Sequence, residues 1–132
     1  MTILVGYTPT PAGDAALTFA LDESDRRGEP LHVLNTSRGD KVVDPRYADE
    51  EGWAQVRARL EEAGVEFHLD RRIDDRDPAE ALLATAEDVA ASAIVIGIRR
   101  RSPTGKLIFG SEAQTVLLEA DCPVLAVKAP RT

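Results

Sequence analysis

Short apolar runs alternate along the chain with longer segments in which apolar residues recur every three or four positions. Four apolar runs have strand length and are bounded by turn-favouring residues, so they predict strands at residues 2–7, 31–34, 93–98 and 122–127. Residues 65–73 alternate only in part and predict a more exposed strand. The longer amphipathic segments predict helices at about residues 12–27, 46–63, 78–90 and 111–120. Strands that alternate with helices predict an α/β fold, in which right-handed crossovers place helices on both faces of a parallel sheet.

Residues at the ends of the predicted helices support these boundaries. Gly28 and Gly64 directly follow the first two helices, and glycine is the usual residue at a helix C-terminus. Asp77 is placed to cap the third helix with its side chain, and Pro78 suits the first helical position. Ser111 is placed to cap the fourth helix, in a capping box with the residue three positions later.

Length and charge narrow the function classes. The chain has 132 residues, of which 43% are hydrophobic and 30% charged, and this predicts a single domain over residues 1–132. The net charge of −7 argues against general binding to nucleic acid or to an anionic membrane surface. Cys122 is the only cysteine, and no segment resembles a signal peptide or a bilayer-spanning helix. These features predict a cytoplasmic protein.

Loops at the carboxyl ends of the predicted strands are the candidate ligand sites, because open α/β sheets bind ligands there. They comprise residues 8–13, 35–44 and 97–111. In the last loop, Gly110 and Ser111 precede a helix whose free N–H groups favour an anion. Basic side chains add positive charge there, namely those of Arg99, Arg100, Arg101 and Lys106. The loop therefore predicts phosphate binding, with a plain helix cap and solvated arginines as the alternative.

Two known nucleotide or phosphate folds fit poorly. In the P-loop pattern GxxxxGK[ST], the first glycine would fall on Arg100, and Leu107 would stand at the hydroxyl position. A P-loop NTPase is therefore disfavoured. A phosphoacceptor receiver domain has a similar length and strand order, but it needs acidic residues after the first strand, where this chain has YTPT.

Gly97, Arg100, Gly110 and Ser111 have the spacing of the signature GxxGx9G[ST], with arginine in place of the second glycine. With ILVGY near the start, AIVIG before the loop and DCPVLAVK near the end, this signature resembles that of the universal stress protein family over nearly the whole chain. The resemblance implies a five-stranded sheet of order 3-2-1-4-5 and a homodimer paired through the last strand, residues 122–128. It also implies an adenine nucleotide, with ATP as the first candidate, between the loops after strands one and four.

The resemblance further implies which residues contact the nucleotide: Tyr7, Thr8, Pro9, Val33, Leu34, Gly97, Arg99, Arg100, Gly110, Ser111 and Glu112. Glu112 is expected to act through its backbone amide, and Val33 and Leu34 through main-chain groups near the adenine. Arg100 places a side chain where the family has glycine, and this side chain either points outward, clamps a phosphate or blocks the pocket. The segment 8–10 stands where many members have Asp-Gly-Ser, so the acidic residue expected near the ribose or a metal is missing, and a role for Mg²⁺ is left open.

The remaining chemistry-bearing residues favour structural roles. His32 and His68 lie inside predicted strands without metal-ligand spacing, and Cys122 is interpreted as a small buried side chain. The acidic residues of segment 74–77 are interpreted as a helix cap with solvated neighbours rather than a metal site.

No nucleophile with an assignable base can be identified, so the chain is predicted not to be an enzyme. An ATP-hydrolysing or nucleotidyl-transferring enzyme on the same fold is a weaker third hypothesis. The leading hypothesis is a non-catalytic stress-response protein whose nucleotide occupancy regulates a dimer or partner surface. The second hypothesis is an interaction or dimerisation module whose pocket is blocked by Arg100.

Overall fold

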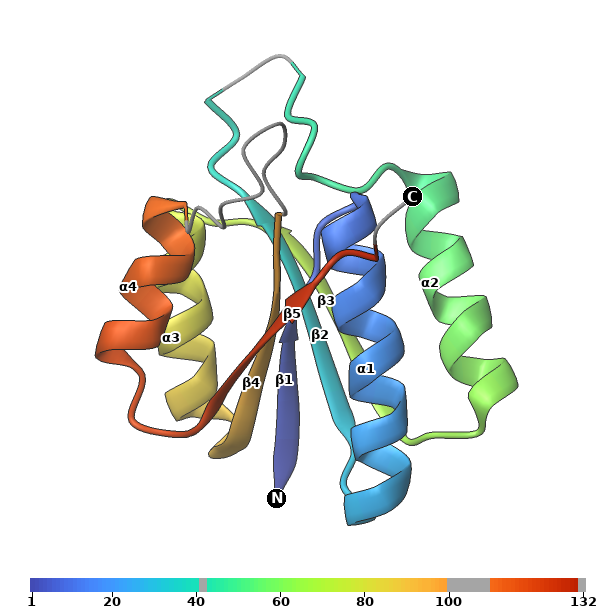
Figure 1. The fold of residues 1–132 in the computed structure, drawn as a ribbon. Coiled ribbons are helices and arrows are strands. Elements are labelled where there is room, and N and C mark those ends of the chain that lie inside the picture. Colours follow the sequence, from blue (N-terminus) through green and yellow to red (C-terminus); the bar gives the residue numbers. More distant parts are fainter. Residues whose placement is uncertain (41–42, 100–109, 131–132) are drawn as a thin grey trace.

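The computed structural model describes residues 1–40, 43–99 and 110–130 (Figure 1). Strands and helices alternate along the chain, as the hydrophobic pattern predicts. The strands are β1 (Thr2–Gly6), β2 (Leu31–Ser37), β3 (Phe67–Ile73), β4 (Ala91–Ile98) and β5 (Val124–Lys128). The helices are α1 (Pro11–Arg27), α2 (Glu50–Ala63), α3 (Pro78–Asp88) and α4 (Ser111–Glu119). Within these residues, no helix is both long enough and apolar enough to cross a bilayer.

The strands form one parallel five-stranded sheet in the order β3-β2-β1-β4-β5, which confirms the predicted fold class. Helices α1 and α2 cover one face, and α3 and α4 cover the other (Figure 1). The strand order reverses between β1 and β4, since β1 leads to β2 on one side while β4 pairs with β1 on the other. In sheets of this kind that reversal opens a crevice at the carboxyl ends of the strands.

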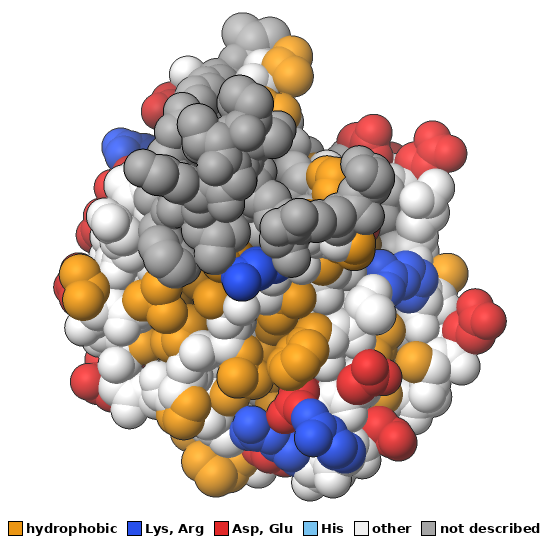
Figure 2. Space-filling model, viewed as in Figure 1, with side chains coloured by type: hydrophobic (Ala, Val, Ile, Leu, Met, Phe, Trp, Pro, Cys, Tyr) orange, Lys and Arg blue, Asp and Glu red, His pale blue; other side chains and the backbone are white. Residues whose placement is uncertain are grey.

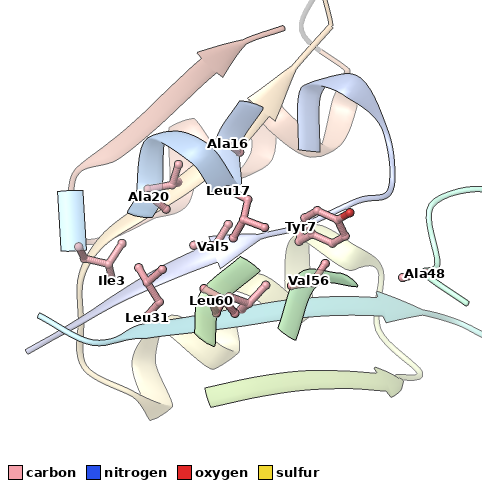
Figure 3. Close-up of a cluster of buried hydrophobic side chains, with 12 residues drawn as sticks. Ile3, Val5, Tyr7, Ala16, Leu17, Ala20, Leu31, Ala48, Val56 and Leu60 are labelled. Atoms are coloured by element: carbon pink, nitrogen blue, oxygen red, sulfur yellow. The ribbon is translucent and has the colours of Figure 1, made fainter. Parts of the chain in front are cut away.

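The core has two layers because successive side chains of a strand point to opposite faces. Val5 of β1 packs with Leu17 of α1 and Leu60 of α2 on one face (Figure 3). Leu4 packs with Leu82 of α3 on the other face. Each of these leucine side chains stabilises the fold by about 1.5–3 kcal/mol through burial. Burial on both faces explains why β1 and β4 read as apolar runs rather than alternating patterns.

The predicted starts of β3, β4 and β5 each differ from the structure by two residues, and the two larger errors both concern the segment after the second strand. Residues 35–37 were expected in a loop but extend β2, where all seven residues are buried. Helix α2 begins at Glu50 rather than near residue 46, because Asp49 caps it by accepting a 2.7 Å hydrogen bond from the Gly52 amide. The described residues in between, 38–40 and 43–49, belong to no helix or strand.

Helix termini follow the prediction only in part. Gly28 and Gly64 end their helices in the left-handed conformation, as expected. Asp77 precedes α3 but makes no capping bond; its Oδ1 accepts a 2.7 Å hydrogen bond from Arg38 instead. The predicted capping box at Ser111 is also wrong. Gly110 occupies the N-cap position, Ser111 is the first helical residue, and no side chain makes a capping hydrogen bond to this helix.

Candidate functional site

A cavity of about 700 Å³ lies at the carboxyl edge of the sheet, where the strand order reverses. Its walls are the ends of β1, β2 and β4, the first turns of α3 and α4, and the loop that follows β2. This is the place at which the loop positions predicted a ligand. We call it the cleft.

The inner wall of the cleft is apolar. It is formed by side chains from β2, β4 and the two helices on that face, namely Leu34, Ile96, Ala79, Leu82 and Val116. They belong to the same hydrophobic cluster that joins α3 and α4 to the sheet. Because side chains along a strand alternate between the two faces of the sheet, this face presents an apolar surface in the cleft. Such a surface is suited to bind a flat aromatic ring.

The turn after β1 forms a second wall and is held by its own hydrogen bonds. The hydroxyl groups of Thr8 and Thr10 lie 2.9 Å apart, and the Thr10 hydroxyl accepts a 3.1 Å bond from the Gly13 amide, which caps α1. A Cβ on Gly13 would lie 1.8 Å from the Thr8 carbonyl oxygen, so only glycine permits this compact turn. The uncharged hydroxyl groups of Thr8 and Thr10 therefore occupy the turn in which many members of the family that the sequence resembles have an acidic residue.

Gly97 lines the cleft at the end of β4, but its local contact is with protein backbone. A Cβ at this position would lie 2.1 Å from the carbonyl oxygen of Ala12, in the first turn of α1. The glycine is therefore required by the passage of α1 across β4. The φ angle of Gly97 is not positive, so close approach of α1 rather than backbone conformation requires glycine here.

Asn35 ties three segments of the cleft together from a fully buried position. Its side-chain nitrogen donates 2.8 Å hydrogen bonds to the carbonyl oxygens of Tyr7 and Arg46. Its side-chain oxygen accepts a 2.8 Å bond from the Ala48 amide. One amide thus connects the end of β1, the end of β2 and the loop before α2, and all three of its bonds go to backbone groups.

An ion pair spans the cleft between the loop after β2 and helix α4. Arg46 donates from Nη1 to Oε1 of Glu112, which lies in the first turn of α4. That hydrogen bond raises the pKa of Arg46 more than partial burial lowers it. Asp44 adds negative charge nearby, with its Oδ1 3.8 Å from Nε of Arg46.

The structure brings most of the predicted contact residues to the cleft. Those that line it are Tyr7, Thr8, Leu34, Gly97, Arg99, Gly110 and Glu112. Val33 instead points into the core on the opposite face, while Pro9 and Ser111 are exposed outside the lining. Arg100, Arg101 and Lys106 lie outside the described residues. The assignment of these residues to nucleotide contact stays a prediction.

Sequence reasoning missed Asn35, Arg46 and the wall residues of α3. Asn35 was assigned to a loop because it is polar, and its hydrogen bonds depend on a fold not visible from local pattern. Arg46 was placed at the start of a helix. The α3 residues could have been found, since Pro78 and Ala79 open a helix at the ligand-binding edge of the sheet.

The histidines and clustered acids have structural partners away from the cleft. His32 lies 3.0 Å from Oδ2 of Asp70 and packs against the His68 ring at 4.8 Å. Although burial raises the pKa of Asp70, hydrogen bonds from Arg72 and His32 lower it overall. Burial raises the pKa of the Cys122 thiol. Across the part of the chain that the structure describes, no group of His, Cys, Asp and Glu is arranged to hold a metal ion.

The sheet order and the cleft at its reversal define an open α/β protein with a crevice at the carboxyl ends of its strands. A model of the universal stress protein family matches residues 1–128, and the chain belongs to this family. A universal stress protein of Mycolicibacterium smegmatis is 44% identical over 126 residues, which cover 96% of each chain.

Two solved structures of universal stress proteins from Archaeoglobus fulgidus share the fold. One has a TM-score of 0.77 and 33% identity, with 96% of this chain and 97% of that chain covered. The other, solved in complex with dAMP, has a TM-score of 0.71 and 26% identity, with 96% of each chain covered.

Proposed function

We propose that this universal stress protein binds an adenine nucleotide in the cleft and acts as a non-catalytic regulator. The observation that carries the proposal is the cleft itself, which has a volume of about 700 Å³, an apolar inner wall and a polar mouth. Small-molecule sites combine these features, because apolar side chains bind the ring and a few polar groups orient the ligand. The dAMP complex of the Archaeoglobus relative supports an adenine nucleotide as the ligand class.

The proposed orientation follows from the two ends of the cleft. The adenine packs against Leu34, Leu82 and Ile96, because the burial of a flat ring against apolar side chains is favourable in free energy. The phosphate lies toward Arg99 and Gly110, at the start of α4, where amide groups and a guanidinium favour an anion. ATP remains the first candidate.

A role for Mg²⁺ is not required by the described residues. The carboxylates among those that line the cleft are Asp44 and Glu112, and both have protein partners: Asp44 accepts from Ser37 and from the Arg46 amide, and Glu112 accepts from Arg46. We therefore propose that the nucleotide binds without a metal.

The lining residues support binding rather than catalysis. The described part of the lining contains no His, Cys, Ser or Lys, the groups that most often act as nucleophile or base. Regulation would follow from occupancy, since a ligand in contact with both α3 and α4 can stabilise one arrangement of these helices over another.

Thermal unfolding with AMP, dAMP and ATP, with and without Mg²⁺, tests the proposal. A ligand at ~100 times its dissociation constant stabilises the fold by about 2.7 kcal/mol. Ala113→Phe fills the cleft from α4 and is expected to abolish this shift. Ala54→Phe makes the same change on the exposed side of α2 and is expected to leave the shift intact. The absence of a shift with every nucleotide would overturn the proposal.

The alternative function is an interaction or dimerisation module. β5 is an edge strand, and Figure 2 shows hydrophobic side chains gathered around it. On neighbouring α4, Leu118 is 83% exposed. Unpaired edges favour pairing with another chain, so we propose a homodimer through residues 122–128 in either case.

Sedimentation measures the dimer. Arg100→Gly separates the two functions, because nucleotide binding gained only in this variant would mean that Arg100 blocks the cleft.

A further inference from the structure

The ion pair between Arg46 and Glu112 joins opposite sides of the cleft mouth. The two residues are 66 positions apart in sequence, and both line the cleft. Each side chain keeps 41% of its surface exposed, so water reaches the pair and the contact opens at little cost. A ligand that enters the cleft therefore meets this pair.

The backbone of Arg46 is held independently of its side chain. Its carbonyl oxygen accepts the 2.8 Å bond from Asn35, and its amide donates a 3.0 Å bond to Oδ1 of Asp44. Asp44 is fixed in turn by a 2.8 Å bond from the Ser37 hydroxyl to its other oxygen. The guanidinium can thus exchange its partner by rotation about side-chain bonds, without a change in the loop.

Glu112 presents an anionic hydrogen-bond acceptor to Arg46, and the phosphate of a ligand would present the same kind of acceptor. A carboxylate and a phosphate both accept parallel hydrogen bonds from the planar guanidinium fork. The two anions cannot approach the same fork closely without repulsion. A phosphate that binds Arg46 must therefore displace Glu112, whereas a ligand without phosphate leaves the ion pair in place.

We propose that Arg46 recognises the phosphate of the bound nucleotide and that Glu112 competes with it. The pair then sets how strongly the cleft prefers a nucleotide over its uncharged nucleoside. This inference rests on the proposed function and goes beyond it by assigning specificity to two side chains. The loss of an exposed ion pair implies a modest effect, about two- to fivefold in affinity per substitution.

Titration calorimetry with AMP and with adenosine tests the inference in the 132-residue chain. Glu112→Gln is expected to tighten AMP binding about two- to fivefold and to leave adenosine binding unchanged. Arg46→Gln is expected to weaken AMP binding only. Arg59→Gln is the matched control, because Arg59 pairs with Asp14 at 3.9 Å and does not line the cleft.

The double variant Arg46→Gln/Glu112→Gln shows whether Glu112 affects AMP binding through Arg46. If Glu112 acts by holding Arg46, its substitution gains little once Arg46 is gone. An equal gain in both backgrounds would mean that Glu112 repels anions generally, and this would overturn the competition. Melting temperatures of the variants without ligand verify that each is folded.

The remaining outcomes separate this inference from the proposed function. Equal AMP affinity in the original chain and Glu112→Gln overturns the inference but leaves nucleotide binding intact. AMP binding that occurs only in Glu112→Gln supports the inference in its strongest form. If neither AMP nor adenosine binds to any of these proteins, both proposals fail.

Discussion

The end of β4 and the first turn of α1 are in backbone contact at Gly97 and Ala12. A Cβ atom on Gly97 would stand 2.1 Å from the carbonyl oxygen of Ala12, far inside van der Waals distance. The glycine that belongs to the family signature therefore also determines how closely α1 approaches the sheet. A substitution at this position acts on stability before it acts on any ligand.

Gly97→Ala is expected to lower the free energy of unfolding by about 1–3 kcal/mol, because α1 must shift to accommodate the methyl group. Gly110→Ala is the matched control, since a Cβ there meets no described atom within 4 Å. It is expected to cost less, through the weaker N-cap preference of alanine. Urea unfolding of both variants measures the difference, and equal costs would contradict the prediction.

Asn35→Ala is expected to be among the most destabilising single changes at the cleft. It leaves the buried carbonyls of Tyr7 and Arg46 and the Ala48 amide without their partner, each at about 1–3 kcal/mol. Urea unfolding at neutral pH measures the loss, which we expect to exceed about 2 kcal/mol. Unchanged stability would mean that water replaces these bonds.

Asn35→Asp refines this test. It keeps the acceptor for Ala48 but turns both donors into a carboxylate that faces two carbonyl oxygens. The folded state then favours the protonated acid, so its pKa is raised, and the stability of this variant is expected to rise as pH falls. A variant whose stability relative to the original chain does not change with pH would contradict the expected orientation of the amide.

Tyr7 is expected to ionise only in strongly alkaline solution. Burial and the hydrogen bond of its hydroxyl to Asp14, 3.1 Å long, raise the pKa of Tyr7 from 10.0 to about 12. The neutral form is the one that the fold favours, so its stabilisation is complete below pH 10 and is lost as pH rises toward 12. Urea unfolding, followed by fluorescence of Trp53 beside Tyr7, measures this slope. Tyr7→Phe is expected to remove the part of the slope that phenolate formation causes.

Asp74 is expected to contribute to acid sensitivity. Hydrogen bonds from the Arg76 side chain and amide hold the pKa of Asp74 well below its usual range. Its stabilising effect is therefore present above the ordinary carboxyl pKa and is lost as pH falls below it. Acid unfolding of Asp74→Asn is expected to show a shallower loss than the original chain. Asp75→Asn removes a charge at an exposed neighbour and controls for net charge.

The fold was predictable because its core strands are buried on both faces. The runs around Val5 and Val95 are apolar without interruption, and the helices between the strands leave a parallel sheet as the simple solution. The strand order came from resemblance to the family. Local pattern failed at residues 35–37, where polar side chains are buried because tertiary hydrogen bonds satisfy them.

The candidate site was predictable at the level of loops and much less so at the level of side chains. Gly97, Gly110 and Thr8 line the cleft because the carboxyl ends of parallel strands meet at one edge. The contact between Arg46 and Glu112 depends on the path of a loop and on two long side chains. No spacing rule encodes such a contact, so only the assembled fold reveals it.

The three hydrogen bonds of Asn35 have an entropic consequence for binding. They hold the loop before α2 against the ends of β1 and β2 without help from a ligand. Affinity is weakened by the conformational entropy that is lost when binding orders a flexible segment. The hydrogen bonds of Asn35 already order this part of the wall, so that loss is smaller here. The entropy loss that remains there comes from the ordering of side chains such as that of Arg46. Substitution of a residue that pairs with such a side chain therefore changes the affinity directly.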